Sequence, residues 1–504
     1  MKKQKSDRIW NGVSLVVLAL AAGVLGLLLW QIWKLNMLPD NYFLILSGVC
    51  LLTAGLLCLL LFRKSRGTRI FGYLLALLVL AGCFVGSRTV ARVYETISSI
   101  TAPMKVNVVL EVYVRADDPA ENIEDTIGYR FALPSDIPQA ELDPVIGELT
   151  QLLQEEPEIL WQENLLAQMD ALFSGEVDAV VLNSAYLTIL EDLEGYGDYA
   201  SRVKLLHKTV VEKEVSQPKP PVGEKQEDDQ SQEAPEKNSF LCYVSGLDNR
   251  HNVLSDGRSD VNILVAVNLD THQILLLSTP RDYYVVNPAS TTDAMDKLTH
   301  CGIYGVGNSM EALRILYGYQ PDYYARINFA GFETLVDAIG GVTVYVDSAF
   351  VTHGGYYMHE GLNYLNGEQA LSFARTRKTL TGVGNTRGKN QMRLIAAIVD
   401  QLSASTLLQN YDDILKSLEG MFSTDMPAEE IGRLMQTQIA EMPKWEIFSF
   451  EVTGTGASDK CWAAGNERLY VAYPHMDSVA YATELMEKVL TGEVLTQEDM
   501  TMHK

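Results

Sequence analysis

Cysteine, histidine and positive charge are scarce in this sequence, and each shortage excludes a class of protein. The 504 residues contain six cysteines with no CxxC pair, which excludes the common zinc and redox frameworks. The eight histidines are scattered, and no serine–histidine or cysteine–histidine arrangement indicates a covalent nucleophile. The net charge of −24 argues against a nucleic-acid partner, which would reward a basic surface. Any anion that the protein binds must therefore meet a local cluster of positive charge.

Three long apolar segments near the N-terminus predict transmembrane helices. They are Gly12–Trp30, Tyr42–Phe62 and Ile70–Val85, and roughly 20 apolar residues are enough to cross the hydrocarbon core. A cleaved signal peptide would have one short apolar run and a small-residue cleavage site, whereas this sequence has three apolar runs and no such site. Basic residues precede the first segment and fill the loop between the second and third. The positive-inside rule therefore places both in the cytoplasm and everything after about residue 88 outside the cell.

The composition changes several times along the rest of the chain. A stretch with four prolines, many charged residues and no aromatic residue separates two regions of α/β pattern, and such a stretch cannot bury enough apolar surface to order itself. The predicted boundaries are 1–88 for a three-helix membrane anchor, 104–210 for a small accessory α/β domain, 211–238 for a disordered linker, 239–491 for a second α/β domain and 492–504 for a tail.

In the accessory region, Val106–Val114 and Val177–Leu182 are predicted strands, and Leu142–Phe173 has helical periodicity. The stretch GEVDAVVLNSAYLTIL resembles a segment of extracellular solute-binding domains, although an α/β spacer explains it equally well. In the second domain, the predicted strands are Phe240–Val244, Val261–Val267, Ile274–Ser278, Tyr323–Ile327 and Val342–Val346. The predicted helices are Met310–Tyr317, Phe332–Ile339, Glu368–Phe373, Asn390–Leu402 and Val479–Leu490.

Charged side chains gather at the ends of these predicted elements. They are Asp248 after the first strand, Arg258 and Asp260 just before the second, Arg281 and Asp282 after the third, and Arg375, Arg377 and Arg387 at and after a later helix. Ligands of open α/β sheets bind at strand ends, where loops converge, so we expect these residues to share one site.

Arginines and aspartates in this number fit a pyrophosphate. Guanidinium groups stay charged and donate two parallel hydrogen bonds to phosphate oxygens. Asp248 and Asp260 are hard oxygen ligands for Mg²⁺ or Mn²⁺, and Lys297 can add a further positive charge. Because arginines repel one another, several of them at one site indicate that an anion binds between them.

Each motif also has an ordinary structural explanation. A single RSD or PRD is usually a surface loop with a local salt bridge, and the RTR at a helix end can serve the helix dipole. His300 and Cys301 are interpreted as a loop pair. One disulfide bond among Cys242, Cys301 and Cys461 stays open, because the sequence does not indicate a pairing. The weight of the charged motifs comes from their order along the chain.

That order is GLD, RSD, PRD, DKL, FAGFETLVDAIGGVTVYVD and LNGEQALSFARTR, followed by an arginine and a helix with Gln391. It resembles the LytR–CpsA–Psr family over about residues 239–490. The resemblance implies a mixed sheet between helices, with an apolar tunnel for a prenyl chain. It also implies a bacterial cell-surface phosphotransferase that moves glycopolymers, such as wall teichoic acid or capsule, from undecaprenyl pyrophosphate onto peptidoglycan.

Matched residue by residue, the resemblance assigns Asp248 and Asp260 to a metal, Mg²⁺ or Mn²⁺. It assigns Arg258, Arg281, Arg375, Arg377 and Arg387 to the diphosphate, and it puts Asp282 and Lys297 close to the head group. Two positions depart from the family pattern: Thr299 replaces a frequent asparagine, and Gly384 replaces an acidic residue. Neither departure removes a matched arginine or metal carboxylate.

The expected reaction is attack of a peptidoglycan hydroxyl on the phosphorus next to the glycopolymer, with polyprenyl phosphate leaving and Asp260 or Asp282 accepting the proton. A hydrolase would use the same residues and admit water as the acceptor. A non-catalytic receptor for a wall polymer would need a cytoplasmic output domain, which the short predicted cytoplasmic segments do not supply. Direct contact with DNA is the weakest alternative, because the folded part is acidic and predicted to lie outside the cell.

Overall fold

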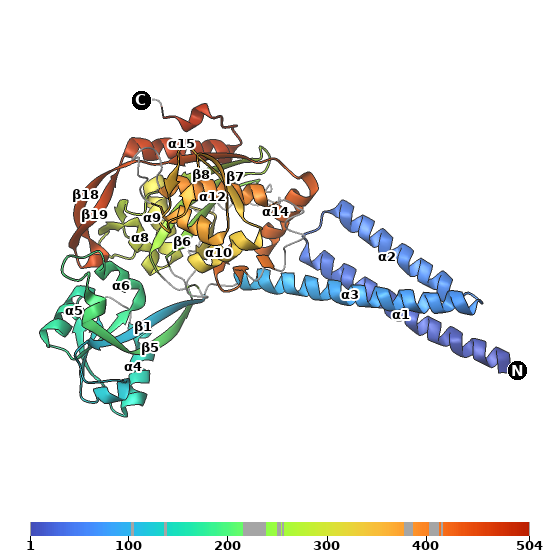
Figure 1. The fold of residues 1–504 in the computed structure, drawn as a ribbon, viewed down its shortest axis with the longest axis horizontal. Helices are drawn as coiled ribbons and strands as arrows, with labels where there is room; N and C mark the ends of the chain where they lie inside the picture. The colour runs from blue at the N-terminus through green and yellow to red at the C-terminus, as the bar shows by residue number, and fades with distance from the viewer. Residues whose placement is uncertain are drawn as a thin grey trace, which may run out of the picture. The chain divides into compact units, whose positions relative to one another are not determined.

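The structure is a computed structural model, shown in Figure 1. It describes residues 2–101, 105–135, 139–214, 238–248, 254, 257–376, 387–402, 413–414 and 417–502. Contacts divide the chain into two compact units. The first comprises residues 1–101, 403–415 and 426–444, and the second comprises the remaining residues.

The first unit is built on three long helices, α1 (Lys2–Leu35), α2 (Asp40–Leu61) and α3 (Arg66–Ile100). All three are long and apolar enough to cross a membrane. Because α3 continues to Ile100, the predicted end of the anchor at residue 88 falls inside a helix. A further helix, α14 (Ala428–Glu441), contacts the turn after α1, where Gln436 Nε2 donates to the backbone oxygen of Asn36 at 2.8 Å.

The second unit begins with the accessory domain, defined here as residues 105–214. Its five-stranded mixed sheet has the order β3-β2-β4-β1-β5. The strands are β1 (Lys105–Arg115), β2 (Arg130–Pro134), β3 (Glu158–Gln162), β4 (Ala179–Asn183) and β5 (Val203–Glu214). The helices are η1 (Ile123–Thr126), α4 (Gln139–Leu153), α5 (Leu165–Ser174), α6 (Ser184–Leu190) and α7 (Tyr199–Arg202).

Two sequence predictions for this region need correction. The helical periodicity over Leu142–Phe173 conceals β3, which separates α4 from α5 and pairs in parallel with β2. The predicted linker begins too early, because β5 continues to Glu214 and pairs with β1 along its length. Residues 215–237 of that linker lie outside the described residues.

The C-terminal domain, defined as the part of the second unit from residue 238 onward, contains a six-stranded mixed sheet in the order β16-β11-β6-β7-β8-β17. The strands are β6 (Ser239–Leu247), β7 (Ser259–Asn268), β8 (Gln273–Ser278), β11 (Tyr323–Asn328), β16 (Phe422–Thr424) and β17 (Glu446–Glu451). Strand β7 is antiparallel to both β6 and β8, whereas β6 and β11 are parallel. The start of β7 therefore lies beside the ends of β6 and β8.

Helices cover both faces of this sheet. On one face, Tyr243, Leu264 and Leu277 pack in one buried cluster with α9 (Val306–Tyr317) and α15 (Met476–Thr491). Side chains alternate between faces along a strand, so Val244 and Val261 point the opposite way. That second face meets α10 (Phe329–Ala338), α11 (Gly367–Arg375) and α12 (Arg387–Gln401). The predicted strands and helices of this domain are all present, with ends that differ by a few residues.

Smaller elements surround this core. They are the two-stranded sheets of β9 (Tyr284–Val286) with β10 (Met295–Lys297), β12 (Val342–Val346) with β15 (Gly361–Leu365), β13 (Phe350–Val351) with β14 (Tyr357–Met358), and β18 (Gly454–Cys461) with β19 (Glu467–Pro474). The short helices are α8 (Leu298–Cys301), η2 (Gly302–Tyr304), η3 (Trp462–Ala464) and η4 (Glu498–Met500).

Candidate active site

The candidate site lies at the sheet edge where β6 and β8 end and β7 begins. The register of β6 against β7 shifts between Gly246 and Leu247, directly before Asp248. A Cβ atom on Gly246 would come within 2.6 Å of the Val261 side chain, so this close approach requires glycine. Because Gly246 pairs with Val261 and Leu247 pairs with Ser259, Asp260 is the extra residue on β7. Such bulges re-aim side chains, and both Asp260 and Asp248, which follows Leu247, line one pocket.

Asp260, the second residue of β7, is the centre of the cluster. Arg281 Nη1 donates to its Oδ1 at 2.7 Å, and Arg387 Nη1 lies 3.6 Å from its Oδ2. Thr299 Oγ1 donates to the same Oδ1 at 3.4 Å. Asp260 and the Arg281 side chain are 8% and 10% exposed, so this is a nearly buried ion pair.

The two partners hold each other in the charged state. Burial would raise the pKa of Asp260, but Arg281 and Arg387 lower it by more, and the net shift is downward. Burial would lower the pKa of Arg281, but Asp260 and Asp282 raise it by more. Asp260 is therefore ionised at neutral pH. A carboxylate with a lowered pKa is a poor proton acceptor, which weakens its expected role as a base.

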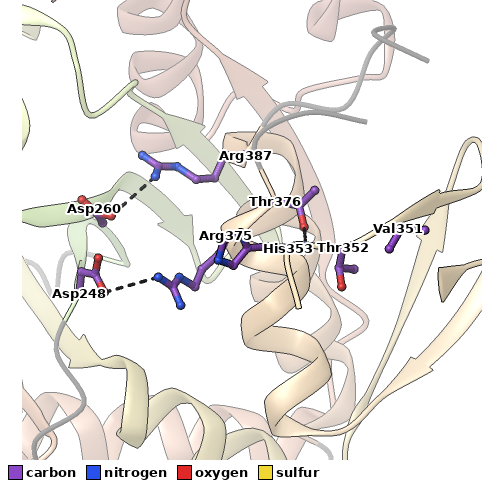
Figure 2. A pocket seen from close by; sticks show the side chains of 8 residues that line it. All are labelled: Asp248, Asp260, Val351, Thr352, His353, Arg375, Thr376 and Arg387. Carbon is purple, nitrogen blue, oxygen red and sulfur yellow. Dashed lines mark hydrogen bonds and ion pairs between the residues drawn. The ribbon is translucent and has the colours of Figure 1, made fainter. Parts of the chain in front are cut away.

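Asp260 also lines a polar pocket of about 540 Å³. Figure 2 shows the side chains of the lining residues. Asp248, Asp260, Arg375 and Arg387 line the pocket, together with backbone and side chains of the segment 351–353 and Thr376. Arg375 Nη2 lies 4.0 Å from Asp248 Oδ1. The pocket wall thus combines two guanidinium groups with two carboxylates, which is a fitting surface for a phosphate group and a divalent cation.

An apolar pocket of about 220 Å³ adjoins the polar one and shares Asp260, Arg375 and Arg387 with it. Its remaining walls come from the second face of the sheet and from α10, α11 and α12. They include Val244, Val261, Ile327, Phe329, Phe332, Leu335, Leu371, Leu394, Ile395, Ile398 and Val399. The guanidinium of Arg375 lies 5.0 Å from the centre of the Phe329 ring, at the boundary between the polar and apolar walls.

Three further predicted residues lie beside this pocket without lining it. Arg258 Nη1 donates to Asp192 Oδ2 at 2.9 Å. Lys297 Nζ lies 3.8 Å from Asp282 Oδ1 and 3.9 Å from Asp192 Oδ2. Asp282 Oδ2 also lies 3.7 Å from Arg281 Nε. Within the described part of the chain, the buried Nε atoms of Arg258 and Arg281 have no hydrogen-bond partner.

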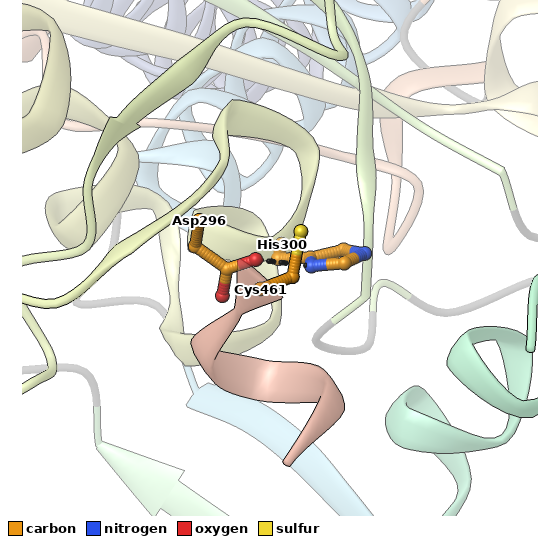
Figure 3. Close-up of side chains that lie close together, drawn as sticks. All are labelled: Asp296, His300 and Cys461. Atoms are coloured by element: carbon orange, nitrogen blue, oxygen red, sulfur yellow. Dashed lines mark hydrogen bonds and ion pairs between the residues drawn. The ribbon is translucent and has the colours of Figure 1, made fainter. Parts of the chain in front are cut away.

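Asp296, His300 and Cys461 form a buried polar cluster in which their side chains lie close together (Figure 3). His300 Nδ1 and Asp296 Oδ1 are 2.6 Å apart, and the backbone N–H groups of Lys297 and Ala463 donate to Asp296 at 2.8 and 2.9 Å. Burial raises the pKa of the Cys461 thiol to about 12, so it stays protonated at neutral pH.

Hydrogen-bond donors already use both oxygens of Asp296. We therefore interpret this cluster as a structural support. It also corrects the prediction of a loop pair at His300, because His300 is fully buried and bonded to Asp296. The six cysteines are free, and no disulfide bond joins Cys242, Cys301 and Cys461.

Hydrogen bonds and ion pairs connect most of the predicted site residues. Asp260 contacts Arg281 and Arg387, Asp248 contacts Arg375, and Asp282 connects Arg281 with Lys297. Arg377 and Gly384 lie outside the described residues. Asp192 was not predicted, because no local signal in the sequence connects it with Arg258, which it reaches from the accessory domain. The hydrogen bond from Thr299 to Asp260 was not predicted either.

Comparison with known proteins agrees with this organisation. The model of the LytR_cpsA_psr family matches residues 205–484, more than half of the chain. The polyisoprenyl-teichoic acid–peptidoglycan teichoic acid transferase TagU of Oceanobacillus iheyensis is 31% identical over 228 residues, which cover 44% of this chain and 69% of that protein. TagT of Bacillus subtilis, which carries the same description, is 33% identical over 195 residues, 36% of this chain and 59% of that protein.

Among solved structures, the crystal structure of TagV from B. subtilis is similar to this chain. The two share 24% sequence identity with a TM-score of 0.42. The similarity covers 51% of this chain and 98% of the TagV chain.

Proposed function

The chain belongs to the LytR–CpsA–Psr family, and on that premise we propose that it is a membrane-anchored transferase of cell-wall glycopolymers. Its donor is a glycopolymer of teichoic-acid or capsule type on undecaprenyl pyrophosphate, and its acceptor is peptidoglycan. The relatives TagU and TagT are described as transferring teichoic acid from a polyisoprenyl carrier to peptidoglycan, which supports this assignment.

The observation that carries the proposal is the pair of adjoining pockets. A lipid-linked pyrophosphate has a strongly anionic head and an apolar tail. The polar pocket offers Arg375 and Arg387 to the head, and the apolar pocket offers the inner faces of α10, α11 and α12 to the tail. Because the two pockets share Asp260, Arg375 and Arg387, one molecule can occupy both with its head at the boundary.

The residues also fit a divalent cation, Mg²⁺ or Mn²⁺. Asp248 and Asp260 line the same pocket, Asp260 is ionised, and carboxylate oxygens are the ligands that these hard cations prefer. Bound there, the cation would neutralise charge on the pyrophosphate oxygens. This role agrees with the lowered pKa of Asp260 better than proton transfer does.

In the reaction, an acceptor hydroxyl oxygen attacks the phosphorus next to the glycopolymer. A new phosphorus–oxygen bond forms, the bond to the bridging oxygen breaks, and polyprenyl phosphate leaves. Arg281, Arg375 and Arg387 stabilise the charge that develops on the phosphate oxygens. The proton of the hydroxyl goes to a carboxylate; of the two aspartates predicted for this role, Asp282 is the one without an assigned metal.

The proposal also places the protein in a bacterial membrane with the site on the outer face. The three apolar helices support anchoring by length and composition. Basic residues before α1 and between α2 and α3 support a cytoplasmic location for these two segments, so the chain after α3 would be extracellular.

The test uses the full chain in detergent with Mg²⁺, a short glycan on a polyprenyl pyrophosphate and peptidoglycan oligomers. We expect mass spectrometry to detect a phosphodiester-linked product that disappears with a chelator and in Asp260→Ala. Release of glycan phosphate without transfer would replace the proposal with a hydrolase. An intact donor that stays bound would replace it with a receptor.

A further inference from the structure

The accessory domain and the C-terminal domain share a buried apolar cluster. Leu187 and Leu190 of the segment around α6 pack in it with Ile303 and Ala464 of the C-terminal domain. The rings of Tyr186 and Tyr304 meet edge to face, with centroids 5.8 Å apart. Burial of apolar surface is the main force that holds domains together, so this contact fixes the position of whatever follows α6.

Asp192 follows α6 by two residues, and the shared cluster brings it to the site. Its carboxylate accepts a hydrogen bond of 2.9 Å from Arg258 and lies 3.9 Å from the Lys297 ammonium. The side chains of Arg258 and Lys297 are only 10% and 6% exposed, whereas that of Asp192 is 38% exposed. Nearly buried cations need a counter-charge, and within the described residues Asp192 is the carboxylate paired with Arg258.

We propose that Asp192 is a positioning residue that holds Arg258 and Lys297 ready for the pyrophosphate, so that the accessory domain completes the anion site. This inference rests on the proposed function. It adds a residue that lies outside the stretch matched by the family, residues 205–484. It also gives the accessory domain a role in the chemistry of this particular chain.

In the alternative role, Asp192 would compete with the pyrophosphate, because its carboxylate would occupy the position of a phosphate oxygen. The geometry favours positioning. Asp192 accepts a hydrogen bond from one terminal nitrogen of Arg258, so this contact leaves the other N–H groups of the guanidinium unused. Lys297 keeps Asp282 as a second partner at 3.8 Å. Both cations therefore retain donors for a ligand while Asp192 restrains them.

The experiment compares Asp192→Asn, Asp192→Glu and the matched control Glu191→Gln in the full chain in detergent. Glu191 is an exposed neighbour for which the described residues show no ion pair, so its variant removes the same charge without the contact. Binding of geranyl pyrophosphate is measured by calorimetry, and KM and kcat are measured with the lipid-linked donor. Thermal unfolding of each variant checks that the fold is retained.

We expect Asp192→Asn to weaken binding and raise the donor KM roughly 10-fold, with a smaller change in kcat. The factor is moderate because Asp192 is partly exposed to solvent. Asp192→Glu should recover most of the loss, and Glu191→Gln should bind like the parent. In an Arg258→Ala background, Asp192→Asn should have a clearly smaller effect, because the main contact is already gone.

Unchanged or tighter binding in Asp192→Asn would overturn the inference, and tighter binding would identify Asp192 as a competitor. A parallel measurement on Arg281→Ala distinguishes a failure of this inference from a failure of the proposed function. If Arg281→Ala loses geranyl pyrophosphate and Asp192→Asn does not, only the inference fails. If neither variant changes binding, the assignment of the pyrophosphate site fails as well.

Discussion

Replacement of Arg281 by alanine should damage both catalysis and stability, and the structure separates the two effects. Arg281 and Asp260 form a nearly buried ion pair with a 2.7 Å hydrogen bond. Removal of one partner from such a pair typically costs about 3–5 kcal/mol, because the other charge stays buried. Arg387 lies 3.6 Å from Asp260 and compensates part of the charge, so we expect about 3 kcal/mol.

For a domain of this size, a loss of about 3 kcal/mol lowers the unfolding midpoint by roughly 6–12 °C. The rate of transfer should fall on the order of 10²–10³-fold, which is the usual effect of removing one donor to developing negative charge. The assays are thermal unfolding of the full chain in detergent and the transfer reaction followed by mass spectrometry.

A second substitution distinguishes the two effects. Arg281→Ala combined with Asp260→Asn removes the uncompensated charge, so it should regain much of the lost stability and none of the activity. The matched control is Arg314→Ala, since Arg314 pairs with Glu311 on the exposed surface of α9 and should change neither property. Turnover close to that of the parent protein in Arg281→Ala, together with an unchanged midpoint, would refute the reasoning.

Two further predictions concern acid stability and the apolar pocket. Burial would raise the pKa of Asp296, but His300 and backbone N–H groups lower this pKa by more, so the net shift is downward. The stability that the ionised Asp296 contributes is therefore present above about pH 4, and it is lost as the pH falls through the lowered pKa of the folded protein. Urea unfolding between pH 3 and 6 should therefore show that Asp296→Asn lowers the free energy of unfolding at pH 6 and lowers it less near pH 3. The same difference in free energy between variant and parent at every pH would contradict this. Ile398→Asp places a charge in the wall of the apolar pocket and should raise the KM for a long-chain donor about 10-fold or more, with a smaller effect on a geranyl donor. Equal effects on the KM of both donors would show that the lipid tail does not occupy that pocket.

The helices and strands of the C-terminal domain could be predicted because their signals are local. The apolar runs of β6, β7 and β8 and the amphipathic pattern of α12 lie within single segments of the sequence. Strand β3 was missed for the same reason, because a five-residue strand between two helices has too short a pattern to compete with their periodicity. The continuation of α3 to Ile100 was also missed, because hydropathy marks the apolar part of a helix and not its end.

Most of the candidate site was also predictable from the order of its motifs. Asp260 contacts Arg281 and Arg387, and Asp248 contacts Arg375, at the ends of elements that the sequence predicts. Asp248, Asp260, Arg375 and Arg387 line one pocket. The roles of these residues in binding a pyrophosphate and a metal remain predictions, which the variants above can test.

The three long apolar helices, the alternation of strands and helices, and the charged residue types at the candidate site can all be inferred from the sequence, because hydropathy, periodicity and charge are properties of short segments. Which of these charges come into contact depends on the tertiary structure. Asp192 has no local feature that connects it with Arg258, and the contact exists because α6 is buried against the C-terminal domain. Asp296 and His300 are only four residues apart, but tertiary packing brings the backbone N–H of Ala463 to Asp296 and adds Cys461 to their cluster. Such contacts depend on how distant segments pack, and packing is set by the whole chain.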